Sequence, residues 1–318
     1  YRSSRGLGDV YKRQILLYYS FMEILRTPEE YFNNLEDYNF SENYITIKIA
    51  DNLSARMHYV DVNSNSDETI LLLHGEPTWS YLYRKMIPIL EKSGKRIIAP
   101  DLIGFGKSDK IKEKEEYTYE RHVVWTSEII SQLGLKNITL FAQDWGGLIG
   151  LRMVANHPEL FDGLVLSNTW LPIGKGSSEG FDAWKKYSQT VEKFNSGRIV
   201  YGGTVNKISD KAVEAYNAPF PGEDYLACAR QFPTLVPMDP DAPSVPENIE
   251  AWKILKQFKK PTVTIFGTED KVSAGGEKLF QKLIPGCEGM NHKLIHGGHF
   301  IQEDQPEELA EAIINLYK

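Results

Sequence analysis

The feature that most constrains the fold is a series of short apolar segments that recur along the chain. Residues 70–73 and 97–99 are continuous apolar runs, which are typical of parallel strands buried on both faces. Residues 44–50 and 55–62 alternate partly between apolar and polar side chains, as the strands of a half-exposed hairpin do. Eight strands are therefore predicted, at residues 44–50, 55–62, 69–73, 96–100, 138–142, 164–167, 262–266 and 293–295.

Helical patterns separate most of these segments, at residues 81–92, 119–133, 148–156, 276–283 and 306–317. Alternation of strand and helix predicts an α/β fold in which a mostly parallel sheet carries helices on both faces. The alternation is broken at residues 169–250, which contain aromatics, prolines and helical patches but no convincing buried strand.

This interruption divides the predicted fold into two parts. Residues 22–168 and 251–318 form the predicted core, and residues 169–250 form a helical cap inserted after the sixth strand. Open α/β sheets bind ligands at the carboxyl ends of their strands, so the cap would cover that edge. We expect the chemistry to lie between the two parts.

Residues 1–21 are left out of the fold prediction. Lys12 and Arg13 precede an apolar stretch at residues 15–21, which is too short for a signal peptide and is followed by no small-residue cleavage site. We interpret residues 1–21 as a non-native leader and expect native translation to start at Met22.

Composition excludes several classes of protein. The 36 basic and 43 acidic residues give a net charge of −7 without a concentrated basic stripe, so no nucleic-acid partner is expected. Cys228 and Cys287 form no CxxC pair, which argues against a disulfide framework and a cysteine-ligated zinc site. No apolar stretch approaches the roughly 18 to 20 residues of a membrane-spanning helix. We expect a soluble monomer of the reducing cytoplasm, with no membrane partner.

The most informative motif lies at residues 138–150. A strand ends in Ala142, Asp144 follows, and a helix begins near Gly146. This is the pattern of a nucleophile elbow, a strained turn whose crowded backbone requires small neighbours, with aspartate in the place usually held by serine. The alternative is that Asp144 only caps the helix. The other parts of a hydrolytic site follow in the right order, which favours a nucleophile.

The loop at residues 74–79 directly follows the third strand. In hydrolases with such an elbow, this loop supplies one backbone N–H of the oxyanion hole, so we expect the donors to be the backbone N–H groups of Glu76 and Trp145. His74 belongs to the same turn, and we expect it to hold the loop by hydrogen bonds rather than to act as a base.

Two later turns supply candidates for an acid and a base. The seventh strand is followed by Glu269 and Asp270, of which Asp270 fits the spacing of a triad acid. The eighth is followed by His296 and His299, of which His299 is the better candidate because it follows a glycine pair and opens the last helical region. The two histidines have no third ligand at a suitable spacing, so no metal site is predicted.

An aspartate nucleophile restricts the reaction. A carboxylate that attacks an sp³ carbon forms an alkyl ester, which water can then hydrolyse at the carbonyl. The leaving group is either an epoxide oxygen, which needs proton donors such as a pair of cap tyrosines, or a halide, which needs only weak donors in a dry pocket. Trp145 and Trp184 offer two indole N–H groups of that kind. Trp184 could alternatively be an aromatic of the cap core.

Several segments resemble the haloalkane dehalogenases of the α/β-hydrolase superfamily, in the subfamily with an Asp-His-Asp triad and two tryptophans. The likeness runs from about Met22 to the C-terminus, cap included. The segments that carry it are residues 74–84, 104–109, 143–147, 180–184, 218–221 and 298–303.

This resemblance implies a role for five residues. It implies Asp144 as nucleophile, His299 as base, Asp270 as its partner, and Trp145 with Trp184 as halide ligands.

Two related groups fit less well. The sister subfamily places asparagine where Glu76 stands and its acid where Asn168 stands. Fluoroacetate dehalogenases carry arginines just after the nucleophile, whereas this chain has Trp145 and Leu148, so a haloacid is disfavoured.

The sequence therefore predicts a haloalkane dehalogenase that needs no cofactor or metal and converts a small haloalkane and water into alcohol and halide. One rival is an epoxide hydrolase of the same fold, which would release a diol. Another is a catalytically silent hydrolase fold used as a receptor, against which the complete set of Asp144, Asp270 and His299 argues.

Overall fold

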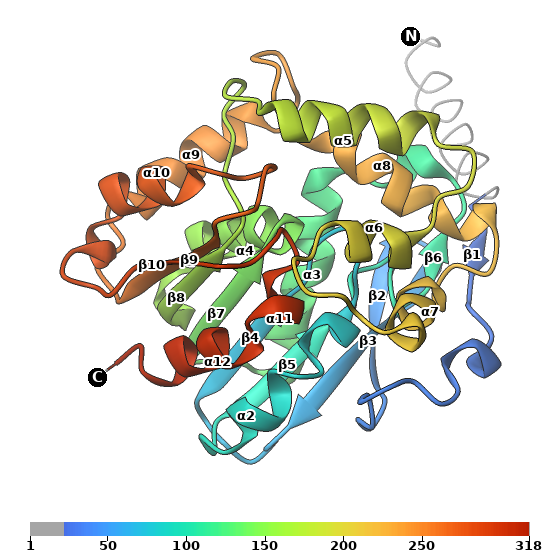
Figure 1. Ribbon diagram of the computed structural model, residues 1–318, viewed down its shortest axis with the longest axis horizontal. Coiled ribbons are helices and arrows are strands. Elements are labelled where there is room, and N and C mark those ends of the chain that lie inside the picture. The colour runs from blue at the N-terminus through green and yellow to red at the C-terminus, as the bar shows by residue number, and fades with distance from the viewer. Residues whose placement is uncertain (1–21, 318) are drawn as a thin grey trace, which may run out of the picture.

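The computed structural model describes residues 22–317, so the predicted leader at residues 1–21 lies outside the described residues (Figure 1). Eight strands form one sheet in the order β10-β9-β8-β7-β4-β5-β3-β2, which confirms the prediction of an eight-stranded sheet. The strands are β2 (Asn43–Ala50), β3 (Leu53–Val62), β4 (Thr69–Leu73), β5 (Arg96–Pro100), β7 (Ile138–Gln143), β8 (Phe161–Ser167), β9 (Thr262–Gly267) and β10 (Lys293–Ile295).

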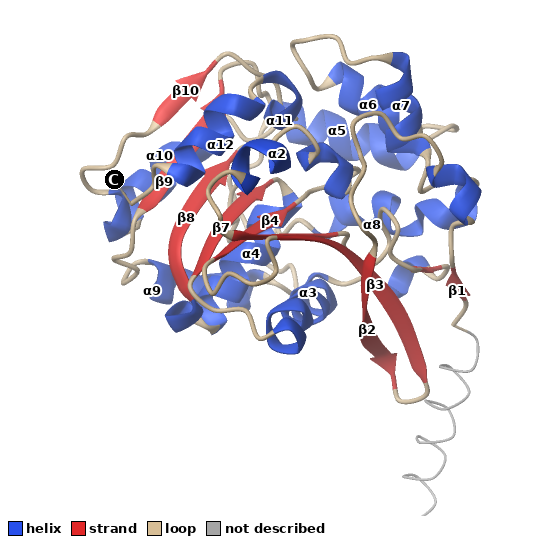
Figure 2. Ribbon diagram, turned by 90° about the horizontal axis from the view of Figure 1, so that it is seen from below, coloured by secondary structure: helices blue, strands red, loops and turns tan. Residues whose placement is uncertain are grey.

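The sheet is parallel except at one edge. Strand β4 pairs in parallel with β5 and β7, and β8, β9 and β10 continue the parallel part. Strand β3 runs antiparallel to both β5 and β2, and Figure 2 shows the β2–β3 hairpin projecting from the sheet. A further small sheet, which the sequence did not predict, pairs β1 (Ile24–Leu25) with β6 (Lys110–Ile111).

Continuous apolar strands make two separate cores. Leu71 and Leu73 of β4 face one cluster of buried side chains, whereas Ile70 and Leu72 face the other. All four side chains are fully buried, because successive residues of a strand point to opposite faces and both faces are covered.

Helices cover both faces of this sheet (Figure 2). Helices α3, α4 and α9 pack together on one face, and α2 and α12 pack together on the other. Helix α10 joins the first group through stacking of Phe280 on Trp252 of α9. Their bounds are α2 (Ile87–Glu91), α3 (Tyr119–Leu133), α4 (Trp145–Asn156), α9 (Val245–Leu255), α10 (Gly276–Leu283) and α12 (Pro306–Ile314).

The prediction of one continuous helix at residues 81–92 is wrong, because the structure has two short helices there. A 3-10 helix at Ser80–Tyr83 is followed by the short α2, which has Pro88 in its first turn. Proline lacks a backbone N–H and its ring excludes the carbonyl four residues earlier, so one continuous helix cannot pass through this position.

Four helices between β8 and β9 lie over the strand ends (Figure 1). They are α5 (Glu179–Thr190), α6 (Ser196–Gly202), α7 (Asp210–Asn217) and α8 (Ala227–Leu235). The predicted boundary between residues 250 and 251 falls inside α9. Because α9 packs on α4, we propose that the cap ends before Val245.

A buried ionic cluster joins this cap to the core. The Glu303 carboxylate in α11 (Ile301–Asp304) receives hydrogen bonds from both Nη atoms of Arg84 and from the Tyr216 hydroxyl of α7. Lys85 Nζ lies 2.8 Å from the same carboxylate. Burial opposes ionisation of Glu303, but Arg84 and Lys85 outweigh it and lower the pKa of Glu303 below its ordinary value.

We predict that Glu303→Ala lowers the free energy of unfolding by about 3–5 kcal/mol, because it leaves the buried Arg84 guanidinium without its anion. Glu250→Ala is the matched control, since Glu250 pairs with Lys253 on an exposed helix face, and should cost about 0.5 kcal/mol or less. Urea unfolding at neutral pH measures both values. Equal losses in the two variants would contradict this role of the cluster.

Candidate active site

Asp144 lies in a strained turn between β7 and α4. Its backbone has φ 52° and ψ −128°, a conformation that non-glycine residues rarely adopt. A Cβ atom on Gly146 would lie 2.0 Å from the carbonyl oxygen of Leu73, so only glycine fits there. The Asp144 side chain makes no capping hydrogen bond to α4, which rules out the alternative that it serves as a helix cap.

The two carboxylate oxygens of Asp144 have different surroundings. Oδ1 accepts a hydrogen bond of 2.8 Å from the Glu76 backbone N–H. Oδ2 lies 3.4 Å from His299 Nε2. The Trp145 backbone N–H, the second donor expected from the sequence, makes no hydrogen bond to this carboxylate among the described residues. One oxygen is therefore held by the backbone, and the other lies beside His299.

His299 connects Asp144 to Asp270. His299 Nδ1 lies 3.0 Å from Asp270 Oδ1, and Asp270 also accepts hydrogen bonds from the Val272 and Ser273 backbone N–H groups. The other candidates of the sequence, Glu269 and His296, have exposed side chains and lie 3.9 Å from each other. The fold thus brings together Asp144, His299 and Asp270.

Charges in this group perturb its titration. Burial lowers the pKa of His299, but the negative charges of Asp270 and Asp144 and its hydrogen bonds to them outweigh burial and raise the pKa to about 10. Burial likewise opposes ionisation of Asp270, yet the charge of His299 and the hydrogen bonds lower the pKa of Asp270 below its ordinary value. The resting site therefore favours an imidazolium between two carboxylates.

The loop that carries His299 is held from the core side by two amides. Asn168 Nδ2 donates to the carbonyl oxygens of Gly298 (2.8 Å) and His299 (2.9 Å), and Gln143 Nε2 donates to the latter at 3.1 Å. Asn168 Oδ1 accepts the Gly267 N–H at the end of β9. The side-chain amide of Asn168 therefore positions the loop by binding to the loop's backbone.

The cap holds the same loop from the other side. The buried Asp304 carboxylate accepts backbone N–H groups from Gly298 at 2.8 Å, Asn206 at 2.7 Å and Val205 at 3.0 Å. The Phe300 N–H donates to the Gly203 carbonyl oxygen, 3.2 Å away. The connection between α6 and α7 is thus joined to the loop of His299.

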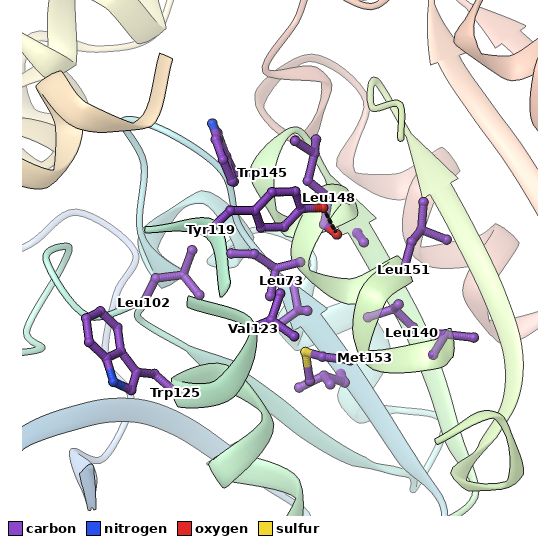
Figure 3. Close-up of a cluster of buried hydrophobic side chains, with 14 of the residues drawn as sticks. Leu73, Leu102, Tyr119, Val123, Trp125, Leu140, Trp145, Leu148, Leu151 and Met153 are labelled. Carbon is purple, nitrogen blue, oxygen red and sulfur yellow. Dashed lines mark hydrogen bonds between the residues drawn. The ribbon is translucent and has the colours of Figure 1, made fainter. Parts of the chain in front are cut away.

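A cavity of about 350 Å³ lies between core and cap and includes Asp144 and His299 in its wall. The indoles of Trp145, from α4, and Trp184, from α5, line it, and neither indole N–H donates a hydrogen bond to any described residue. In Figure 3 the Trp145 nitrogen points away from Tyr119 and the packed side chains. Other wall residues are Leu148, Trp170, Phe181, Ile199, Val236 and Phe300.

Glu76 contributes more than its backbone. Its side chain is buried in the cavity wall, and Oε1 has no hydrogen-bond partner among the described residues. Burial, together with the charge of Asp144, raises the pKa of Glu76 well above its ordinary value, so we infer that this carboxyl group is uncharged.

His74 holds the loop, as the sequence analysis expected. Its Nδ1 lies 2.9 Å from the Gly75 carbonyl oxygen, and its Nε2 accepts the Leu102 N–H. Both ring nitrogens are therefore occupied by backbone groups.

Comparison with known proteins identifies the family. Residues 68–306 match the family model described as alpha/beta hydrolase fold. A curated haloalkane dehalogenase of Psychrobacter cryohalolentis is 50% identical over 93% of this chain and 98% of its own length, and one of Mycolicibacterium paratuberculosis is 45% identical over 92% and 98%. The solved structure of a tetrameric haloalkane dehalogenase from Paraglaciecola agarilytica NO2 superposes with a TM-score of 0.85 at 34% identity, covering 91% of this chain and 97% of that one.

The fold and the elbow with its adjoining histidine define an α/β hydrolase. Within that class, the chain belongs to the haloalkane dehalogenases, hydrolases that act on carbon–halide bonds.

Proposed function

We propose that the protein hydrolyses haloalkanes through an alkyl ester on Asp144. The observation that carries this proposal is the orientation of the Asp144 carboxylate, with Oδ1 bound to the Glu76 N–H and Oδ2 directed to the His299 side of an apolar cavity. Oδ2 attacks the halogenated carbon, a carbon–oxygen bond forms, and the halide leaves with the electron pair of the carbon–halogen bond.

The cavity wall favours a halide over an epoxide oxygen. Among the described wall residues, three indoles donate no hydrogen bond, those of Trp145, Trp170 and Trp184, and Tyr187 is the one tyrosine, whereas epoxide opening calls for paired hydroxyl donors. Indole N–H groups of Trp145 and Trp184 can hold a halide without competing for it as acceptors. These contacts support the assignment of both tryptophans as halide ligands and weaken the epoxide hydrolase alternative.

Ester hydrolysis needs His299 in its neutral form. Attack on the substrate turns Asp144 into an uncharged ester, which removes one of the two anions that raise the pKa of His299. The imidazolium then loses its proton to solvent, and the neutral ring takes a proton from the attacking water. The oxyanion forms on Oδ1, where the Glu76 N–H already points and the Trp145 N–H is available.

Collapse of this intermediate regenerates Asp144 and releases the alcohol. The oxygen that water has added to Cγ stays in the carboxylate of Asp144. One proton of that water goes to the departing alkoxide, and the other remains on His299. Each turnover therefore consumes one water and releases one halide and one proton, with Asp270 orienting the histidine through Nδ1.

The remaining sequence predictions concern the setting of the protein. Among residues 22–317, no helix is both long and apolar enough to cross a bilayer. Cys228 and Cys287 are both buried and unpaired, which supports the proposed reducing cytoplasm. The monomeric state stays a prediction, and the relative from Paraglaciecola agarilytica is a tetramer.

The first functional prediction separates the two half-reactions. His299→Gln should release about one halide per active site and then stop, because alkylation does not need the base and hydrolysis does. Rapid-quench halide assays with 1-bromobutane, followed by mass spectrometry of the peptide containing Asp144, measure the burst and the trapped ester. A folded variant that releases halide without an adduct on Asp144 would argue against the covalent route.

The second functional prediction concerns the pH dependence of turnover. Because hydrolysis requires neutral His299, steady-state turnover should fall as the pH is lowered, whereas the halide burst should persist at pH values where turnover has already declined. Both can be followed between about pH 5 and about pH 9. If the halide burst and the steady-state rate both fell with the same pH midpoint, the idea that only ester hydrolysis needs neutral His299 would be wrong.

The third functional prediction concerns the affinity for halide. Each indole should contribute a charge-assisted hydrogen bond of about 1.5–3 kcal/mol, so Trp184→Phe should weaken bromide binding at least about tenfold and slow alkylation more than hydrolysis. Bromide titration by tryptophan fluorescence measures this. Trp252→Phe is the control, since the Trp252 N–H donates to Leu171 in the core. Unchanged bromide affinity in Trp184→Phe would remove this indole from the site.

A further inference from the structure

The cap side of the cavity carries a cation that the reaction does not use. Arg198, in α6, is an exposed residue that also lines the cavity, so its side chain lies at the rim. It is the one lysine or arginine among the described residues of the wall. Three further ionisable residues of the wall take part in the proposed chemistry or lie beside it. They belong to the core side and are Glu76, Asp144 and His299.

Arg198 has no anionic partner in the described chain. No carboxylate of residues 22–317 lies within ion-pair distance of its guanidinium, which makes no side-chain hydrogen bond there and lies 5.7 Å from the Tyr201 ring. By contrast, Arg230 of α8 forms an ion pair with Glu223. A guanidinium at a cavity rim without an internal partner is able to bind an anion from solution.

Much of the cavity wall is apolar. Trp184, Phe181 and Ile199 are part of it, and they suit an alkyl chain. A ligand that extends from Asp144 to the rim of the cavity would meet the nucleophile and, at the rim, the positive charge of Arg198.

We propose that Arg198 forms an anion subsite that extends the substrate class to ω-haloalkanoates, in which several methylenes separate a carboxylate from the halogenated carbon. This proposal rests on the dehalogenase function proposed above. Asp144 forms the same ester and the same halide leaves with its electron pair. Water hydrolyses the ester to an ω-hydroxyalkanoate, and the substrate carboxylate is unchanged.

The charge distribution sets a minimum length for such substrates. The chain carries a net charge of −7, and the carboxylates of Asp144 and Asp270 outnumber the imidazolium of His299, so a carboxylate near the nucleophile is repelled. Trp145 and Leu148 follow the nucleophile and provide no cation there. Bromoacetate should therefore be a poor substrate, whereas a longer chain places its carboxylate away from Asp144 and beside Arg198.

The test compares kcat/KM for 6-bromohexanoate with kcat/KM for 1-bromohexane, as a ratio, at low ionic strength. Arg198→Gln should lower this ratio about three- to tenfold, the range for a partly exposed charge-assisted contact. Arg198→Lys should retain most of the ratio, and added salt should lower it in the wild type but not in Arg198→Gln. Lys193→Gln is the matched control, because Lys193 is an exposed cation near α6 that does not line the cavity, and should leave the ratio unchanged.

The outcomes separate this proposal from the function on which it rests. A ratio that is the same in wild type and Arg198→Gln, or hydrolysis of 1-bromohexane with none of 6-bromohexanoate, overturns the subsite. If Lys193→Gln lowered the ratio as much as Arg198→Gln, the effect would be general charge and the subsite would again be wrong. Absence of halide release from every substrate would instead contradict the dehalogenase function.

Discussion

The active site depends on one close approach, between the turn after β4 and the turn after β7. The strands are paired in parallel with Leu73 opposite Ala142, so their following turns emerge side by side. Gly146 allows the second turn to touch the Leu73 carbonyl. Only at that separation does the Glu76 N–H reach Asp144 Oδ1. Asp144, the proposed nucleophile, is therefore oriented by the close contact between two turns.

His299, the proposed base, has a different kind of support, which is shared between core and cap. Asn168 and Gln143 hold the loop of His299 from the sheet, and Asp304 joins that loop to the segment between α6 and α7. A displacement of this segment would thus reach His299 through a carboxylate bound to three backbone N–H groups. The cap segment and His299, the proposed base, are therefore mechanically linked.

The sequence was most informative where local patterns determine structure. The buried strands were predictable because continuous apolar runs have few other stable locations, and the elbow was predictable because a crowded turn limits its neighbours to small residues. The break before α2 required the effect of Pro88 to be weighed against an apolar helical pattern. Asp304 and Arg198 could not be assigned, since an acid at a helix end and an arginine in a cap are common. Only the fold shows that Asp304 is bound to three backbone N–H groups and that Arg198 has no anionic partner within residues 22–317.

Charge conservation explains why this set of ionisable groups suits the two steps. In the proposed mechanism, attack moves one negative charge from Asp144 to the halide, so the apolar cavity holds the same net charge before and after carbon–halogen cleavage. An ionised Glu76 would add a second anion beside Asp144, and the raised pKa of Glu76 favours its neutral form. When the halide leaves, the imidazolium of His299 retains Asp270 as its remaining anionic neighbour in the triad. Esterification of Asp144 and exit of the halide from the cavity would therefore together lower the proton affinity of His299 at the point where the ester needs a base.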